Sequence, residues 1–282
     1  MVLIILLASA VCHASWNIIA KGSRDKLTFL WCQLTAASVV LTIPVLLTCP
    51  APDPKGFIFL AISGLMQAAY YFLLAKTYSI GEISAVYPLT RGIAPVIVCI
   101  ASALLGTEPI TALMITSALL IFGGIYVINM KKLSFSEFAA PIKALIEVPA
   151  TRLALLNGII VAAYTLSDKQ SVKYTDPMVV YWVIAVIPAV LIAPLVIKKG
   201  QLKAEISCNK FRILAVSVLT FAAYFLVLKA MSFAGAGYVS AVREISIVFV
   251  AIYSAVRFKE SFPASKIIGA VLIFAGIFLM SI

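Results

Sequence analysis

Two arginines in very hydrophobic sequence are the residues best suited to chemistry. Arg91 and Arg243 each precede a glutamate by 17 residues, and a glycine follows after a further 16. An ionisable side chain within a membrane span costs on the order of 3 kcal/mol, so it usually faces the bundle interior or a wet cavity. Because a guanidinium can hold a carboxylate through two parallel hydrogen bonds, we predict that one or both arginines bind an anionic substrate group. Structural pairing with Glu244, or extension toward the membrane surface, would explain them without a substrate.

Five aromatic or amide residues are predicted to line the same site. Tyr87 lies one helical turn before the first arginine, so the two side chains share a face. Tyr71 and Tyr224 recur at matching places in two similar stretches of sequence, and Trp16 and Asn17 adjoin each other in the first apolar segment. We interpret all five as candidate substrate-binding residues. Hydrogen bonding between helices would explain the recurring tyrosines without a ligand.

Two further residues are candidates for proton coupling. His13 can titrate near neutral pH, and Glu244 is an acidic group within an apolar segment. A neutral imidazole that bonds a neighbouring helix is the alternative for His13. Asp168 lies near the end of a predicted span and is followed by Lys169, so we interpret these two as a solvated ion pair.

The composition indicates an integral membrane protein. The chain is 63% hydrophobic and only 12% charged, with a mean hydropathy of +1.11, whereas about a quarter of a soluble domain is charged. The net charge of +11 does not predict nucleic-acid binding, because Lys and Arg are spread over short loops between apolar segments. The sequence has no CxxC pair, no metal-ligand cluster and no hydrolase motif, so we expect no metal, no cofactor and no enzymatic activity.

Ten apolar segments are each long enough to cross a bilayer as a helix of about 20 residues. We therefore predict an all-α integral membrane protein with ten transmembrane helices. The predicted spans are 2–20, 28–48, 56–76, 83–105, 110–130, 152–170, 177–197, 211–231, 237–257 and 262–282.

The spacing around the arginines predicts an internal repeat. We divide the chain into a first five-span repeat at 1–130, an inter-repeat linker at 131–151 and a second five-span repeat at 152–282. Because each repeat has an odd number of spans, the two must lie in the membrane in opposite orientations. Inverted repeats of this kind are typical of secondary transporters, whose substrate site lies between the repeats near mid-membrane.

The chain resembles the ten-span, EamA-type branch of the drug/metabolite transporter superfamily. The matching features are the paired repeats, two turns at matching places, a glycine-containing segment after each turn and three polar motifs within spans. They are Gly106-Thr-Glu108, Phe258-Lys-Glu260, Gly123-Gly124, Gly269, Gly276, Tyr87-Pro-Leu-Thr-Arg91-Gly, Val242-Arg243-Glu244 and His13-Ala-Ser-Trp-Asn17. The resemblance covers essentially the whole chain. It implies alternating access around a central cavity, usually for export of small metabolites, and both termini inside the cell.

Loop charges and glycines bear on topology and assembly. Most Lys and Arg fall in loops on one side of the predicted membrane, which places both termini outside by the positive-inside rule. This conflicts with the orientation that the resemblance implies. Gly124 and Gly276 let helices approach closely, and we interpret them as packing the two halves together. Dimerisation is the alternative, so the protein is expected to be a monomer or a homodimer.

The sequence therefore predicts a secondary active transporter in the cell membrane, which is the inner membrane in a bacterium. We expect it to export a small polar metabolite, such as an amino acid or organic acid, by alternating access between two inverted repeats. The expected partners are the substrate, the lipid bilayer and protons as coupling ion, with no nucleic acid. Export of hydrophobic or cationic compounds, and a non-transporting membrane scaffold or sensor, are the alternatives.

Overall fold

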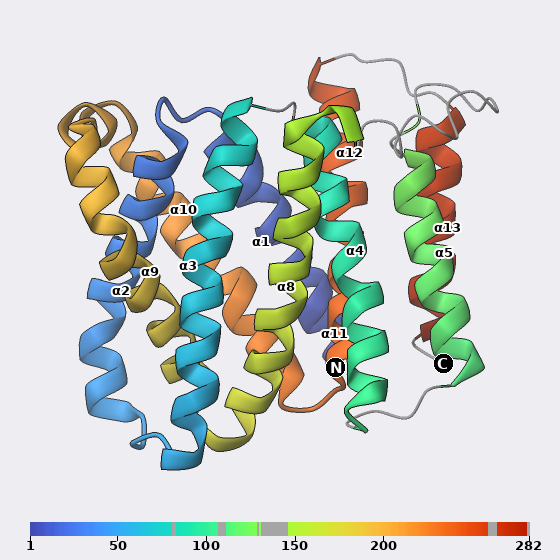
Figure 1. Cartoon of the computed structure of the whole chain (residues 1–282), viewed down its shortest axis with the longest axis horizontal. Helices are drawn as coiled ribbons and strands as arrows, with labels where there is room; N and C mark the ends of the chain where they lie inside the picture. Colours follow the sequence, from blue (N-terminus) through green and yellow to red (C-terminus); the bar gives the residue numbers. More distant parts are fainter. Residues whose placement is uncertain (81–82, 107–110, 129, 131–145, 259–263, 281–282) are drawn as a thin grey trace.

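The computed structural model is a bundle of helices that run roughly alongside one another (Figure 1). It describes residues 1–80, 83–106, 111–128, 130, 146–258 and 264–280. Within the described helices, some side chains are not placed; these belong to residues 21, 83–89, 91–92, 128, 250–251, 254–258 and 280. The predicted linker at 131–151 lies partly outside the described residues. The glutamates Glu108 and Glu260 lie wholly outside them.

The two halves of the chain follow the same order of helices. The first half contains α1 (Val2–Lys21), α2 (Lys26–Thr48), the short 3₁₀ helix η1 (Pro54–Gly56), α3 (Phe57–Ile80), α4 (Ile83–Leu104) and α5 (Ala112–Ile128). The second contains α8 (Pro149–Tyr174), α9 (Pro177–Lys199), α10 (Leu202–Met231), α11 (Ala236–Arg243), α12 (Ile245–Phe258) and α13 (Ala264–Met280).

The helix boundaries follow local sequence chemistry. Asp25 caps α2 by accepting a hydrogen bond from the backbone N–H of Thr28 at 2.8 Å. Asp176 caps α9 in the same way through Met178 at 2.7 Å, and proline occupies the first turn there. Gly200 ends α9 with a φ of +65°, a conformation that glycine adopts without steric cost.

The predicted span at 237–257 is wrong as a single helix. It consists of α11 and α12, which meet at Glu244. The N–H groups of Glu244 and Ile247 bond to carbonyls three residues earlier, at 3.1 and 2.9 Å, so the helix tightens there into a 3₁₀ turn. Arg243 is consequently the last residue of α11.

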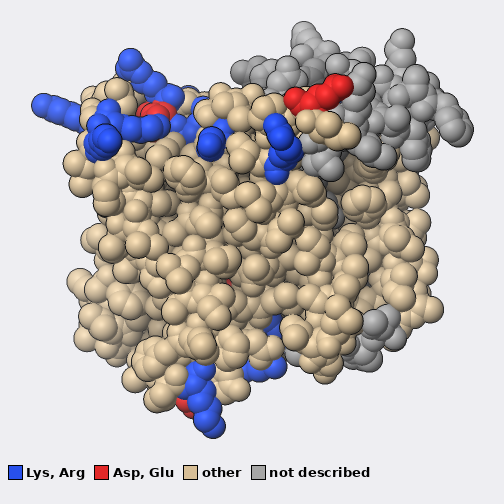
Figure 2. All heavy atoms as spheres, in the orientation of Figure 1, with Lys and Arg blue, Asp and Glu red and all other residues tan. Residues whose placement is uncertain are grey.

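The outside of the bundle is suited to lipid. Six of the described helices are long and apolar enough to cross a membrane, namely α1, α2, α3 with η1, α8, α9 and α10. Large apolar side chains such as Leu47 and Phe211 are exposed. Figure 2 shows Lys and Arg gathered at one end of the bundle and a smaller group at the other, with an almost uncharged band between them in this view. This pattern is that of a polytopic membrane protein.

Two inverted repeats account for the packing. Helix α3 packs against α8 as α10 packs against α1, while α2 packs against α9 and α5 against α13. Exchanging the two halves therefore reproduces the same set of helix pairs. Helices α1 and α8, which begin the two halves, run in opposite directions (Figure 1). The all-α fold with two inverted repeats is thus as predicted. Of the ten predicted spans, only some are long enough in the described residues to cross a membrane.

The α5–α13 pair shows the repeat at atomic detail. A Cβ at Gly124 would lie 2.6 Å from the carbonyl oxygen of Gly269, and one at Gly276 would lie 2.7 Å from that of Ser117. Residues 124 and 276 differ by 152, as do 117 and 269, so the two contacts are equivalent under exchange of the halves. These glycines pack the halves together inside one chain, as interpreted from the sequence.

Replacing Gly124 with alanine is expected to destabilise the protein by about 1–3 kcal/mol, because the new methyl group meets backbone atoms that cannot rotate away. Gly123→Ala is the matched control, since a Cβ there meets no atom within 4 Å among the described residues. Thermal unfolding of the purified variants in detergent measures the difference. Equal melting temperatures for the two variants would contradict close packing at Gly124.

Candidate functional site

A cavity lies between the two halves and is lined by seven helices. The space free of atoms in the cavity and at its mouth measures about 420 Å³. Its lining combines a wall of aromatic rings with a few polar groups and one arginine. The lining residues are His13, Trp16, Leu34, Gln67, Tyr70, Tyr71, Tyr164, Tyr181, Ile184, Ala185, Thr220, Ala223, Tyr224 and Arg243.

The cavity is narrow in this conformation. Only about 20 Å³ of it is wide enough for a water molecule. That volume holds one or two water molecules. A metabolite can therefore enter only if the surrounding helices move apart.

Among the residues that the structure describes, Arg243 is the charged residue of the lining. Its side chain is 4% exposed, and its guanidinium carbon lies 5.2 Å from the ring centre of Tyr224. The cation therefore rests on an aromatic face, an arrangement that holds the guanidinium in place without using its hydrogen-bond donors. A guanidinium carries five N–H donors in a planar fork and remains charged at all relevant pH values. Arg243 is thus positioned to bind an anionic group in the cavity.

Asp168 is fully buried close to this arginine. Its two carboxylate oxygens accept hydrogen bonds from the hydroxyls of Ser63 on α3 and Tyr224 on α10. The predicted solvated ion pair with Lys169 is therefore wrong. Lys169 instead donates to the carbonyls of Met231 and Ala234 at the end of α10, at 2.6 and 2.8 Å.

The error about Asp168 came from the length of its helix. The sequence predicted a span ending at residue 170, whereas α8 continues to Tyr174. Asp168 thus stands six residues inside the helix, about 9 Å from its end. The available signal was its four-residue spacing from Tyr164, which places both side chains on the same face of α8.

Tyrosine rings form one continuous wall of the cavity. The ring of Tyr70 contacts Tyr71 and Tyr164 edge-to-face, with centroid distances of 5.0 and 5.6 Å. Tyr164 contacts Tyr224 in the same way at 6.0 Å. Edge-to-face contacts fix ring orientation. The wall therefore offers a rigid apolar surface beside the arginine.

Two hydroxyls in the lining have no hydrogen-bond partner among the described residues. They are the Tyr181 hydroxyl on α9 and the Thr220 hydroxyl on α10. A buried polar group without a partner costs free energy, so it commonly marks a place where water or a ligand binds. Tyr181 was not among the predicted site residues. Its three- and four-residue spacing from Ile184 and Ala185, which also line the cavity, was the missed signal.

The predicted residues of α1 are arranged around His13. The indole N–H of Trp16 donates to Nδ1 of His13 at 3.2 Å. Both residues line the cavity. Asn17 is buried but outside the lining, because its amide donates to the backbone carbonyl of His13 at 2.8 Å and accepts from the Tyr78 hydroxyl at 3.3 Å.

The remaining predicted site residues have different locations. Tyr71 and Tyr224 line the cavity beside Arg243. Glu244 is buried at the turn between α11 and α12, outside the lining. Tyr87 and Arg91 belong to α4, but their side chains are outside what the structure describes. Their contribution to the site remains a prediction.

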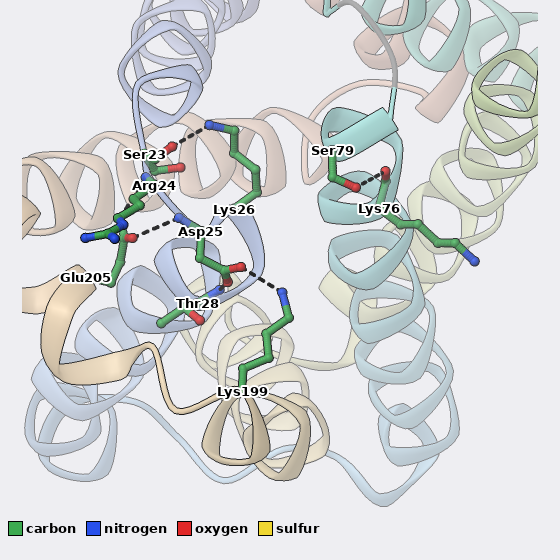
Figure 3. A network of polar contacts seen from close by, with 9 residues as sticks. All are labelled: Ser23, Arg24, Asp25, Lys26, Thr28, Lys76, Ser79, Lys199 and Glu205. Atoms are coloured by element: carbon green, nitrogen blue, oxygen red, sulfur yellow. Dashed lines mark hydrogen bonds and ion pairs between the residues drawn. The ribbon is translucent and has the colours of Figure 1, made fainter.

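A buried carboxylate ties the two repeats together at one end of the bundle (Figure 3). Glu205, at the start of α10, accepts hydrogen bonds from the backbone N–H groups of Arg24 and Asp25 at 3.4 and 2.9 Å. It also accepts from the side-chain amide of Asn209 at 2.8 Å. Asp25 forms an ion pair with Lys199 at the end of α9, with an N–O distance of 2.7 Å. We call Asp25, Lys199, Glu205 and Asn209 the latch.

The ion pair of the latch persists across neutral pH. Burial alone would raise the pKa of Asp25, but hydrogen bonds from Lys199 and Thr28 outweigh it and lower the pKa below its usual value. A carboxyl whose pKa is lower in the folded state stabilises the fold above its unfolded pKa of about 4. That contribution is lost only as the pH falls through the lowered folded value.

The opposite end of the bundle is joined less tightly. Asp176 occupies the place in the second repeat that Asp25 has in the first, since each caps the second helix of its repeat. Its carboxylate lies 4.0 Å from the thiol of Cys49, where Asp25 contacts a lysine. The backbone N–H of Asp53 donates to the carbonyl of Tyr174 at 3.2 Å. The repeat symmetry is therefore broken in favour of the end that carries the latch.

Comparison with known proteins agrees with the two-repeat architecture. A crystal structure of a protein is similar over 99% of this chain and 95% of its own, with a TM-score of 0.75 and 15% sequence identity, which shows the fold alone. No curated protein matches the sequence. The sequence model of the EamA-like transporter family matches residues 1–130 and 149–282, nearly the whole chain. With two inverted halves around an arginine-bearing cavity, the chain belongs to the EamA-like transporter family and is a membrane transporter.

Proposed function

We propose that this transporter moves a small carboxylate-bearing metabolite, an amino acid or organic acid with an apolar part, through the cavity between its repeats. The observation that carries the proposal is Arg243, a buried guanidinium held on a tyrosine ring in an otherwise aromatic cavity. A buried cation in a membrane is costly unless it has a partner or a function. Asp168 already interacts electrostatically with Arg243, and a substrate carboxylate would add a partner that the fork of N–H donors can hold directly.

The lining suits the other parts of such a substrate. The apolar part of the substrate would contact the rings of Tyr70, Tyr71 and Tyr164, because these form the rigid wall beside the arginine. The hydroxyls of Tyr181 and Thr220 can bond a second polar group of the ligand. Ligand sites usually combine a mostly apolar surface with a few placed polar groups, as here.

Transport then proceeds by alternating access. The cavity is too narrow for a metabolite in the present conformation, and the latch joins the repeats at one end. Movement of one repeat against the other opens the cavity first to one side of the membrane and then to the other. Export is the direction that we expect from the family resemblance.

Ligands that share a phenyl ring test the proposal. We expect 3-phenylpropionate and L-phenylalanine to raise the melting temperature of the purified protein, and phenethylamine, which has no carboxylate, to have no effect. The amine probe serves as the control for non-specific binding to the aromatic wall.

The opposite result supports the alternative function. Stabilisation by phenethylamine alone would indicate a transporter of cations, which the tyrosine faces could hold. Failure of all probes, followed by failure of a wider set of organic anions to bind or to be transported in liposomes, would contradict the proposal.

A further inference from the structure

We propose that Asp168 is a proton-binding site that couples substrate movement to proton movement. The candidates from the sequence were His13 and Glu244, so the structure points to a different residue. Asp168 is completely buried between the two repeats and has no contact with solvent. The part of the proposal that concerns substrate rests on the proposed function, whereas proton binding by Asp168 does not.

The partners of Asp168 suit both of its protonation states. The Ser63 and Tyr224 hydroxyls donate to the carboxylate oxygens. A hydroxyl both donates and accepts, so either one can rotate to accept a hydrogen bond from a protonated carboxyl. A lysine or a backbone N–H could only donate, and it would therefore favour the charged form alone. Two hydroxyls allow the proton to come and go without leaving an unpaired buried group.

The location of Asp168 links its charge to the movement of the repeats. Ser63 belongs to α3 in the first repeat, while Asp168 and Tyr224 belong to α8 and α10 in the second. The hydrogen bond between Ser63 and Asp168 therefore crosses the interface that must change during alternating access. Charged hydrogen bonds are roughly twice as strong as neutral ones. Protonation of Asp168 weakens this contact between the repeats.

The charged and titratable groups around Asp168 are few among the described residues. Arg243 on α11 interacts electrostatically with its carboxylate, and Tyr224 on α10 bonds to it. On α8 itself, Tyr164 lies one turn away and Lys169 is bound to carbonyls at the end of α10. Helix α3 presents Tyr70 and Tyr71 to the cavity, and α9 presents Tyr181. Helix α1 presents His13. On α4, the side chain of Arg91 is outside the described residues.

Arg243 connects the proton to the substrate. When the cavity is empty, the positive charge of Arg243 favours a negative Asp168. A substrate carboxylate bound to Arg243 cancels that charge and favours a proton on Asp168. Proton and substrate therefore bind cooperatively, and each increases the affinity for the other by the same factor. The transporter carries both in the direction that their combined gradients set.

The first experiment detects the proton without any substrate. Infrared spectra of the purified protein, stepped from about pH 9 to about pH 4, are compared for the wild type, Asp168→Asn and Asp53→Asn. Asp53 is an exposed carboxylate outside the membrane-spanning helices, so its variant is the matched control. We expect a titrating carboxyl band that is present in the wild type and the control and missing in Asp168→Asn. Identical titrations of all three proteins would overturn the proposal.

A second variant keeps the test decisive if Asp168→Asn does not fold. Ser63→Ala retains the carboxyl group and removes one of its two partners. We expect the midpoint of the Asp168 band to move in this variant and to stay unchanged in Asp53→Asn. A midpoint that does not move would contradict the role of the two hydroxyls.

The second experiment tests coupling to the substrate. Calorimetry measures the affinity for 3-phenylpropionate at about pH 8 and about pH 6, a range in which this probe stays charged. We expect the wild type to bind about 5- to 100-fold more tightly at the lower pH, the upper figure being the limit for one proton over two pH units, and Asp168→Asn to bind equally at both. A pH dependence that survives in Asp168→Asn and disappears in His13→Gln would make the histidine the coupling group. Failure of the probe to bind at any pH would count against the proposed function, and the infrared result would still decide whether Asp168 binds a proton.

Discussion

Replacing Arg243 with glutamine is expected to weaken binding of 3-phenylpropionate by roughly 30- to 4,000-fold. Truncation of one partner in a buried, hydrogen-bonded charge pair costs about 2–5 kcal/mol, and 1.4 kcal/mol corresponds to a factor of ten. Glutamine is of similar length and can still donate one hydrogen bond, but it has neither the charge nor the fork of donors. Transport of the same probe into liposomes should fall with binding.

Two further variants separate the role of Arg243 from a general effect of charge. Arg152→Gln removes an exposed arginine at the start of α8 and should bind like the wild type. Arg243→Lys keeps the charge and loses the planar fork, so we expect intermediate affinity. Wild-type binding by Arg243→Gln would remove this residue from the site and turn attention to Arg91, its counterpart in the first repeat.

Replacing Glu205 with alanine is expected to lower the free energy of unfolding by about 2–6 kcal/mol. The change leaves the N–H of Asp25 and the amide of Asn209 without their acceptor, and each unsatisfied buried donor costs about 1–3 kcal/mol. Glutamine at this position should give an intermediate loss, because it keeps one acceptor oxygen in place of two. Thermal unfolding in detergent measures the series.

The control for Glu205 is a carboxylate that lies outside the bundle. Glu147 is exposed just before α8, and exposed charges contribute little to stability, so Glu147→Ala should unfold within a degree or two of the wild type. If Glu205→Ala were as stable as Glu147→Ala, the latch would not hold the repeats together.

The sequence identified the kind of protein because the relevant signals are local or periodic. A bilayer requires long apolar segments, so composition and segment length alone indicated a polytopic membrane protein. The repeated spacing around Arg91 and Arg243 revealed two halves, and their odd number of spans required an inverted arrangement. The close packing of Gly124 and Gly276 followed from the same repeat, since small residues at matched places allow helices to touch.

Residues that line the cavity could be anticipated from the sequence only where the repeat or the cost of burial marked them, and their role in binding stays a prediction. Arg243, Tyr71, Tyr224 and Trp16 all line the cavity. Asn17 does not, because its bonds are made within α1 and to α3. Position in a helix says which face a side chain shares with its neighbours, but it does not say which neighbouring helix covers that face.

Tertiary structure alone decided the features on which the proposed coupling depends. Asp168 looked like a surface charge, since nothing in the chain near it shows that Ser63 and Tyr224 enclose it from helices more than 50 residues away. The break at Glu244 and the one-sided latch likewise escape a sequence pattern, because they depend on contacts between helices that are distant in the chain. The sequence by itself thus determined the membrane fold, the inverted repeat and the central arginine. Packing between the repeats determined which carboxylate is buried and which end of the bundle carries the latch, because burial depends on contacts between segments distant in the chain.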